Sequence, residues 1–222
     1  MEKITQSRFS QFGEDVPILN YIYSNNLNKG KVLEIGAFDG VGFSNVRALL
    51  VDKPGWKATF VEPSSFCFAK LFETYKMEPS RFDLLNLAVV PENQLNNSTI
   101  LEFHDAPLSA VSSSIPSLTM MHGFHQRNSS GEIVNPRKIY VGKVGMKEIL
   151  EKFGPFDFIN IDVEGYSAEL ALQDWFNPLK YGCKIICIEI DDKISELDNK
   201  FIPYGYEKIL DNGTNAIYAL PL

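Results

Sequence analysis

A strand-like apolar run ends in an acidic, glycine-containing turn near the start of this 222-residue sequence. The run that contains Glu34 predicts a strand, and Gly36 and Gly40 let the following backbone turn sharply and approach a ligand closely. Open α/β sheets bind ligands at the carboxyl ends of their strands, where Glu34 lies. Asp39 lies within the turn and suits a ligand with a cationic end better than a pyrophosphate. A purely structural strand–helix turn is the alternative.

Three more acidic residues follow predicted strands. Glu62 ends the second predicted strand, where a carboxylate can accept hydrogen bonds from ribose hydroxyls. Asp162 and Glu164 follow the fourth predicted strand at positions i and i+2, so both could face one cleft and orient a substrate or accept a proton. The alternatives are a solvated strand-end carboxylate for Glu62 and helix N-terminal charges for Asp162 and Glu164.

A divalent cation is an open possibility at the same edge of the predicted sheet. Glu189 and Asp191 lie at the end of the fifth predicted strand, so with Asp162 and Glu164 they place four carboxylates at adjacent strand ends. Mg²⁺ prefers such hard oxygen ligands. The spacing alone does not require a metal, and ordinary helix-start charge explains Glu189 and Asp191 equally well, so no metal ligand is assigned.

All three histidines lie in or beside one irregular segment, residues 91–144. They are His104, His122 and His125, and each alone is more often structural or exposed than catalytic. A histidine near a cleft can act as a general base. His122 and His125 would share one face of a helix, and we keep His125 as a candidate catalytic residue on the acceptor side.

Short apolar runs alternate with helical stretches along most of the chain. Strands are predicted at 31–35, 58–61, 82–90, 156–161 and 184–190, and helices at 15–27, 45–51, 65–75, 166–175 and 194–201. This alternation implies parallel strands joined by crossover helices. Two final strands, 206–210 and 216–220, flank Asn212-Gly213, a strong hairpin signal. The sequence therefore predicts an α/β fold whose parallel sheet ends in an antiparallel hairpin.

Residues 91–144 interrupt the alternation. Strands are predicted at 99–104 and 138–144, and between them lies a stretch rich in Ser, Pro, Asn and His. An irregular connection of about 30 residues is usually a functional loop, a lid or a disordered segment. We interpret 91–144 as a substrate-side insertion in a single domain, 1–222, whose residues 1–30 form an N-terminal cap segment.

Composition narrows the class of protein. The length fits one α/β domain, and the formal net charge of −7 makes nucleic acid an unlikely partner. Three cysteines, Cys67, Cys183 and Cys187, lack zinc-ligand spacing and are expected to be reduced core thiols. No apolar run is long enough to cross a bilayer and the first residues resemble no signal peptide, so we expect a cytoplasmic protein with no membrane partner.

Taken together and in this order, these residues resemble the FkbM-type family of S-adenosylmethionine-dependent methyltransferases over nearly the whole chain. The similar segments are residues 10–15 (SQFGED), 34–40 (EIGAFDG) with 44–45 (SN), 60–63 (FVEP), 87–90 (LAVV) and 161–166 (IDVEGY). The last segment is the most specific of the five, and it is intact.

The resemblance implies a Rossmann-like class I methyltransferase fold with a mostly parallel seven-stranded sheet, and S-adenosylmethionine as cofactor. It implies O-methylation of a small-molecule or glycan acceptor, commonly a sugar hydroxyl. From their position and chemistry, Asp162 and Glu164 are our first candidates to position the acceptor or take its proton. The expected cofactor-site residues are Gln11, Asp15, Glu34, Gly36, Ala37, Phe38, Asp39, Gly40, Ser44, Glu62, Pro63, Asn86, Ala88 and Asp162.

Three other functions remain open. An NAD-type oxidoreductase would use a related sheet, but the spacing G-x-x-x-G-x-G differs from the dinucleotide fingerprint, and Asp39 and the terminal hairpin also argue against it. A non-catalytic S-adenosylmethionine-binding module is mildly disfavoured by the carboxylates of Asp162 and Glu164. A nucleic acid methyltransferase is weakened by the acidic charge and by the lack of an Asn/Asp-Pro-Pro-aromatic motif.

Overall fold

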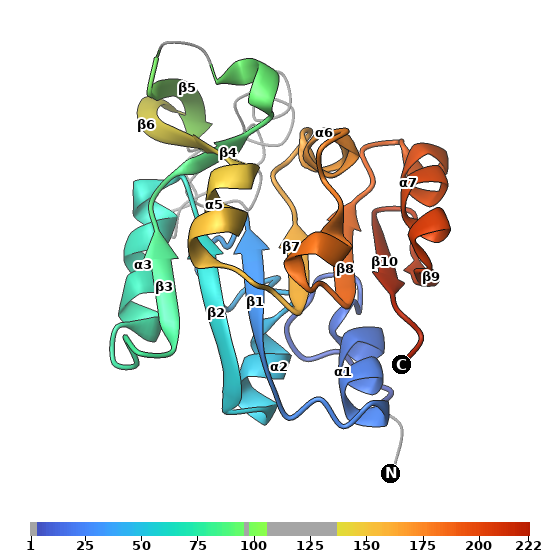
Figure 1. The fold of residues 1–222 in the computed structure, drawn as a ribbon. Coiled ribbons are helices and arrows are strands. Elements are labelled where there is room, and N and C mark those ends of the chain that lie inside the picture. Colours follow the sequence, from blue (N-terminus) through green and yellow to red (C-terminus); the bar gives the residue numbers. More distant parts are fainter. Residues whose placement is uncertain (1–3, 96–97, 106–136) are drawn as a thin grey trace.

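The computed structural model describes residues 4–95, 98–105 and 137–222. Its main sheet has seven strands in the order β3-β2-β1-β7-β8-β10-β9 (Figure 1). These strands are β1 (Lys29–Ile35), β2 (Gly55–Val61), β3 (Phe82–Leu85), β7 (Phe158–Ile161), β8 (Ile185–Glu189), β9 (Glu207–Asp211) and β10 (Asn215–Ala219). The first five are mutually parallel, and β10 is antiparallel to both β8 and β9. The predicted mostly parallel Rossmann-like sheet that ends in an antiparallel hairpin is confirmed.

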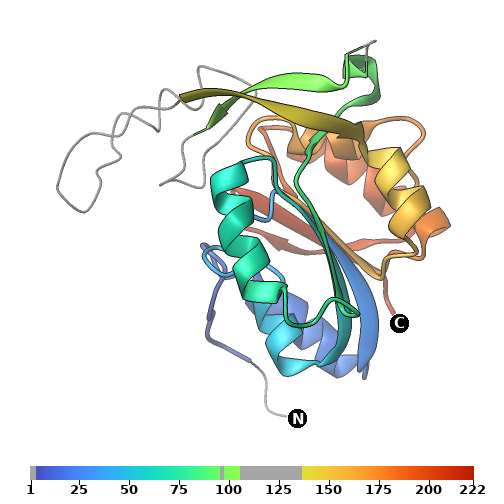
Figure 2. The same cartoon turned by 90° about the vertical axis from the view of Figure 1, so that its left-hand side faces the viewer.

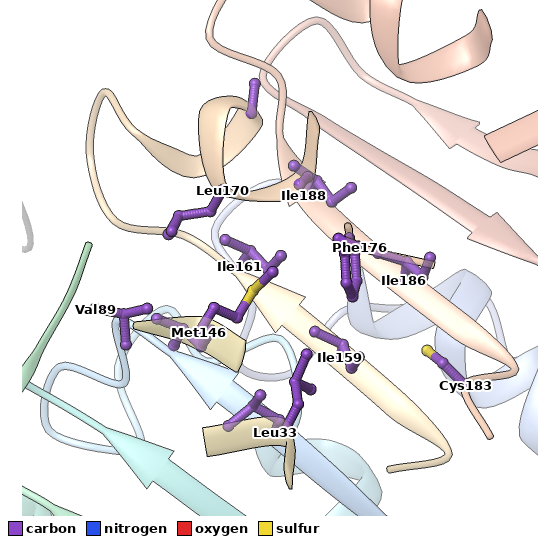
Figure 3. Close-up of a cluster of buried hydrophobic side chains, with 14 of the residues drawn as sticks. Leu33, Val89, Met146, Ile159, Ile161, Leu170, Phe176, Cys183, Ile186 and Ile188 are labelled. Carbon is purple, nitrogen blue, oxygen red and sulfur yellow. The ribbon is translucent and has the colours of Figure 1, made fainter. Parts of the chain in front are cut away.

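Helices cover both faces of this sheet (Figures 1 and 2). Helices α1 (Asp15–Ser24), α2 (Arg47–Asp52) and α3 (Ser65–Tyr75) pack on one face, and α5 (Met146–Phe153), α6 (Ser167–Leu172) and α7 (Ile194–Phe201) on the other. Successive residues of a strand point to opposite faces. Val32 therefore joins the core beneath α1 and α2, while Leu33 joins the second core shown in Figure 3, with Met146, Ile159 and Phe176. Short 3₁₀ helices are formed by Glu92–Gln94, Pro178–Tyr181 and Ile202–Tyr204.

A second, three-stranded sheet lies across the end of the main sheet where the parallel strands finish (Figure 2). Its order is β4-β6-β5, with β4 (Ala88–Val90) parallel to β6 (Arg137–Gly145) and β5 (Ile100–Asp105) antiparallel to it. Strands β5 and β6 correspond to the runs predicted at 99–104 and 138–144. The second sheet thereby provides a wall above the carboxyl edge of the main sheet.

The single strand predicted at 82–90 is wrong, because the structure divides it between the two sheets. Strand β3 ends at Leu85, and β4 starts at Ala88 in the other sheet. Between them, the Asn86 side-chain amide donates to the backbone carbonyls of Glu62 at 2.8 Å and Pro63 at 3.1 Å. These bonds hold the chain at the end of β2 instead of letting it continue the ladder.

Two helices also differ from the sequence-based expectation. Helix α5 was not predicted, although Met146, Ile149 and Leu150 give it a buried face. Helix α6 ends at Leu172 because Gln173 adopts an extended backbone with ψ of 134°, so the predicted helix at 166–175 is too long. Among the residues that the structure describes, every helix is too short or too polar to cross a bilayer. Cys67, Cys183 and Cys187 are buried and form no disulfide, as the sequence predicts.

Candidate functional site

A cavity lies where the carboxyl ends of β1, β2 and β7 meet the second sheet. Its volume is about 1050 Å³, including the part open to solvent. The residues around it come from the N-terminal segment, the loops after the three strands, helix α3, the second sheet and the start of β10. Eleven of the residues expected from the sequence line it: Gln11, Glu34, Gly36, Ala37, Phe38, Ser44, Glu62, Pro63, Ala88, Asp162 and Glu164.

The turn after β1 is fixed between its two neighbouring strands. The backbone N–H groups of Gly36 and Ala37 both donate to the Val61 carbonyl, at 2.9 and 3.1 Å. Gly36 has φ of +84°, and a Cβ on it would lie 1.7 Å from the backbone oxygen of Asp162. Only glycine fits this position, because it has no side chain and tolerates the left-handed backbone. The turn therefore lies directly against the chain leaving β7.

Glu62 presents a buried carboxylate to the cavity from the end of β2. Only 6% of the residue is exposed. One carboxylate oxygen accepts from the Phe38 N–H at 2.8 Å and the other from the Ser64 N–H at 2.7 Å. Burial outweighs these bonds and raises the pKa of Glu62 to about 8. Each oxygen keeps a further lone pair that can accept from a ligand hydroxyl.

Glu34 lies deeper, at the end of β1. The Ser44 hydroxyl donates to its carboxylate at 3.0 Å, and burial raises the pKa of Glu34 to about 8. Asn45 and Asn160 line the cavity beside it and are joined by a 3.1 Å hydrogen bond between their side-chain amides. The floor of the cavity is therefore polar, and its side chains are held by one another.

Three carboxylates meet at the ends of β7 and β8. One oxygen each from Asp162, Glu164 and Glu189 lies within 4.8 Å of the other two. Burial, and then the charges of Glu189 and Glu164, raise the pKa of Asp162 well above its ordinary value. Burial likewise raises the pKa of Glu164 to about 8, with Glu189 and Asp191 adding to the effect. We call Asp162, Glu164 and Glu189 the carboxylate cluster.

Glu14 is a lining residue that the sequence reasoning missed. It is fully buried, and one of its oxygens accepts from the side-chain amides of Asn212 at 2.9 Å and Asn215 at 2.8 Å. The other oxygen accepts from the Phe12 N–H at 3.0 Å. Asn215 also lines the cavity, and its Oδ1 has no hydrogen-bond partner in the described part of the chain. Glu14 lies within the 10–15 segment singled out from the sequence, whereas nothing in the sequence pointed to Asn215.

Asp15, by contrast, folds the N-terminal segment and does not line the cavity. Its carboxylate accepts from the backbone N–H groups of Arg8 at 2.9 Å and Phe9 at 3.1 Å, and from the Ser10 hydroxyl at 3.0 Å. These bonds lower the pKa of Asp15, although burial opposes them as the largest single effect. The expectation that Asp15 lines the site is therefore corrected, because its neighbour Glu14 lines the cavity and Asp15 does not.

Asp39 is also absent from the lining. Its Oδ1 accepts from the backbone N–H groups of Val41 at 3.0 Å and Gly42 at 2.8 Å, so the carboxylate closes its own turn. Short acidic side chains commonly bond to nearby backbone in this way. The sequence-based expectation that Asp39 faces a cationic ligand does not agree with this arrangement.

Gly40 and Asn86 likewise do not line the cavity, and their contacts stabilise the surrounding fold. A Cβ on Gly40 would lie 2.5 Å from a methyl carbon of Leu71, and the Tyr75 hydroxyl donates to the Gly40 carbonyl at 2.8 Å. Asn86 secures the crossing between the two sheets, as described above. The histidine candidates His122 and His125 lie outside the described residues. His104, on β5, lies 3.5 Å from the Glu102 carboxylate.

An apolar wall forms another part of the cavity. It is formed by side chains from α3, the second sheet and the residue before β4, namely Cys67, Leu87, Ala88, Val89, Leu101 and Phe103. Three lining residues, Phe38, Phe43 and Glu164, hold left-handed backbone conformations with φ between 51° and 62°. Such conformations are unfavourable for residues with side chains and gather at functional sites. The cavity thus combines an apolar wall, acidic side chains and three residues with a strained backbone.

No family model matches the chain, and no curated protein matches it. Solved structures that resemble it include the methyltransferase FkbM from Methylobacillus flagellatus KT, with 12% identity and a TM-score of 0.49 over 86% of this chain and 44% of that chain. The N-terminal domain of human METTL16 in complex with SAH has 13% identity and a TM-score of 0.41, covering 92% of this chain and 70% of that one.

A methyltransferase from Pyrococcus furiosus has 15% identity and a TM-score of 0.37, covering 93% of this chain and 84% of that chain. This chain spans less than half the length of the FkbM structure, at 44%. The fold assignment rests on the strand order and the terminal hairpin of the chain itself.

Proposed function

We propose that this protein is an S-adenosylmethionine-dependent methyltransferase. The observation that carries the proposal is Glu62, a buried carboxylate at the end of β2 that faces the cavity beside the Gly36 turn. Both its oxygens are oriented by backbone N–H groups, so the side chain is fixed before any ligand arrives. An acidic residue at this strand end is placed to accept hydrogen bonds from ribose hydroxyls.

The rest of the cavity fits the other parts of this cofactor. The adenine would pack on the apolar wall that contains Ala88 and Phe103, and the ribose would bind at Glu62. The methionyl end would lie along the Gly36 turn above Glu34. Further contacts are proposed for Gln11, Ala37, Phe38, Ser44, Pro63 and Asp162. When bound, the cofactor supplies an electrophilic methyl group, and the protein supplies position and exclusion of water.

The charge of the lining favours this cofactor over NAD. Among the described lining residues there are five carboxylates, Glu14, Glu34, Glu62, Asp162 and Glu164, and no Lys, Arg or His. Burial raises the pKa values of Glu34, Glu62 and Glu164 to about 8, and a nearby cation lowers such a pKa, so the sulfonium and ammonium of S-adenosylmethionine would favour the ionised form of these groups. The pyrophosphate of NAD would meet the same carboxylates without a compensating cation.

We further propose O-methylation of a small hydroxylated acceptor, with a sugar or glycan as the first class to test. A hydroxyl must lose its proton as its oxygen attacks the methyl carbon, and a carboxylate with a raised pKa is a suitable acceptor for that proton. Asp162 and Glu164 line the cavity and have raised pKa values. The choice of a sugar, and the FkbM-type relationship, rest on the segments of the sequence that resemble that family.

Transfer of a radiolabelled methyl group from S-adenosylmethionine to a panel of sugars and hydroxylated small molecules tests the proposal. We expect turnover with at least one acceptor, and we expect Glu164→Gln to lower kcat by about 100-fold or more. Glu207→Gln, an exposed carboxylate on β9, should leave kcat unchanged. Cofactor binding without transfer to any member of the panel would favour a non-catalytic binding module instead.

A further inference from the structure

The carboxylate cluster has the oxygen arrangement of a divalent cation site. One oxygen each from Asp162, Glu164 and Glu189 lies within 4.8 Å of the other two, and the three side chains are all partly buried. They come from two adjacent parallel strands, β7 and β8, whose ends face the same edge of the sheet. Clusters of acidic side chains also occur without a bound metal ion, so this cluster alone does not identify a ligand.

A second observation beside the cluster supplies the missing information. Asn215 begins β10 and lies directly opposite Glu189 in the antiparallel pairing of β10 with β8. Directly opposed residues in such a pair place their side chains on the same face of the sheet. Asn215 is 5% exposed, and it lines the cavity together with Asp162 and Glu164.

The Asn215 amide is oriented but half unused. Its nitrogen donates to the Glu14 carboxylate at 2.8 Å, which turns the oxygen away from Glu14. That oxygen is buried and accepts no hydrogen bond within the described part of the chain. Buried polar atoms are nearly always satisfied in folded proteins, so this oxygen is open to a partner from outside the chain, such as a water or an ion.

The unused oxygen and the three carboxylates share one chemical need. All four are electron-pair donors, and the described lining of the cavity contains no Lys, Arg or His. A bound cation would satisfy the amide oxygen and the three carboxylates together. Carboxylate and amide oxygens are the ligands that Mg²⁺, Mn²⁺ and Ca²⁺ prefer.

We propose that Asp162, Glu164, Glu189 and Asn215 form a site for one divalent cation of the Mg²⁺ or Mn²⁺ type. Mg²⁺ usually keeps several waters when a protein binds it through a few oxygen ligands. Because Asp162, Glu164 and Asn215 line the cavity, its remaining positions face the space where an acceptor hydroxyl would enter. The site does not include Glu62 but shares Asp162 with the proposed cofactor position, and its role toward an acceptor hydroxyl rests on the proposed function.

Titration of the metal-stripped protein with Mn²⁺ alone, followed by the electron paramagnetic resonance signal of free Mn²⁺, tests the site. We expect one saturable Mn²⁺ per chain, displaced by Mg²⁺. Glu189→Gln should weaken binding by at least 10-fold, Asn215→Ala should weaken it by several-fold, and the exposed Glu207→Gln should leave it unchanged.

Asn212→Ala is the matched control for Asn215→Ala, because it removes the other amide that donates to the same Glu14 oxygen. It should leave Mn²⁺ affinity within about two-fold of the parent protein. Circular dichroism establishes that each variant is folded, and Glu164→Gln replaces Glu189→Gln if the loss of the Ser167 contact unfolds the latter.

Two outcomes would overturn the proposal. One is the absence of saturable binding at millimolar Mn²⁺ and Mg²⁺. The other is an affinity that Glu189→Gln and Glu164→Gln both leave unchanged, which would locate the bound ion elsewhere. Binding of S-adenosylhomocysteine, measured on the same protein in EDTA, separates failure of the cation site from failure of the proposed cofactor site.

Discussion

The backbone oxygen of Asp162 occupies the space that a Cβ on Gly36 would need, at 1.7 Å from that position. The two residues follow adjacent parallel strands, β1 and β7, at the edge where the cavity opens. This contact brings the turn that borders the proposed cofactor position against the loop that carries the carboxylate cluster. This close approach, together with the hydrogen bond from the Asp162 N–H to the Ile35 carbonyl at 3.0 Å, keeps the two halves of the site next to each other.

Gly36→Ala is expected to disrupt this contact. The added methyl group meets backbone, which cannot move aside as a flexible side chain can, so we expect a loss of at least about 2 kcal/mol of unfolding free energy. Urea denaturation measures the loss. Gly205→Ala is the matched control, because Gly205 has a similar φ of +90° with nothing within 4 Å, and it isolates the cost of the left-handed backbone. Equal losses in the two variants would show that the Asp162 contact is unimportant.

Asp39→Asn and Asp39→Ala distinguish a structural role from a role in charge recognition. Asn keeps the oxygen that accepts from Val41 and Gly42 and removes only the charge. We expect Asp39→Asn to retain both stability and S-adenosylhomocysteine affinity, and Asp39→Ala to lose about 1 kcal/mol of stability. Calorimetric titration and urea denaturation measure the two quantities. A large loss of affinity in Asp39→Asn would instead place the charge against the ligand.

The buried carboxylates predict how stability changes with pH. Burial raises the pKa of Glu34 to about 8, from the ordinary 4.5, so the folded protein holds a proton that the unfolded chain releases between these values. The resulting stability is fully present below pH 4.5 and is lost as pH rises towards 8, by at most about 1.4 kcal/mol per pH unit for each such group.

Urea denaturation between pH 5 and pH 9 measures this dependence. Glu62 and Glu164 also have pKa values raised to about 8, so all three groups give the same sign. Glu34→Gln should make the slope between pH 5 and pH 8 shallower, and Glu207→Gln should not. An unfolding free energy that rises with pH would contradict the assignment of Glu34 as a buried carboxyl group that is neutral below pH 8. A slope that Glu34→Gln leaves unaltered would contradict it as well.

Arg137→Ala tests the ion pair between the first residue of β6 and the last residue of β5. Arg137 bonds to the fully buried Asp105 through Nε at 2.9 Å and Nη2 at 2.8 Å. Removing one partner of a buried ion pair commonly costs about 3–5 kcal/mol, and the exposed side of Arg137 reduces this, so we expect a loss of about 1–3 kcal/mol. Differential scanning calorimetry provides the measurement. No change in melting temperature would mean that this pair does not hold β5 and β6 together.

The sequence predicted those parts of the site that depend on local pattern. Each of these parts is encoded within a few residues: the run that contains Glu34, the Gly36 turn, Glu62 at a strand end and the Asp162–Glu164 pair. The structure brings all of them to one cavity. The terminal hairpin was equally local, because Asn212-Gly213 specifies its turn. Whether these residues bind the cofactor stays a prediction.

The remaining features depend on contacts between segments far apart in the sequence. Asn215 lines the cavity where its amide donates a hydrogen bond to Glu14, which lies 201 residues earlier in the sequence. No local sequence pattern predicts this contact. The division of 82–90 into β3 and β4 depends on Asn86 reaching the end of β2. Asp39 was misplaced for the opposite reason, since its bonds to Val41 and Gly42 are local and compete with any ligand.

Thermal stabilisation by cofactors tests the central claim most directly. A ligand that binds only the folded protein raises the melting temperature, and at 100 times its Kd it adds about 2.7 kcal/mol. S-adenosylmethionine and S-adenosylhomocysteine should each raise the melting temperature, NAD should not, and Glu62→Gln should reduce the shift while Glu207→Gln preserves it. The absence of any shift at millimolar S-adenosylhomocysteine, or a shift with NAD alone, would contradict the proposed methyltransferase.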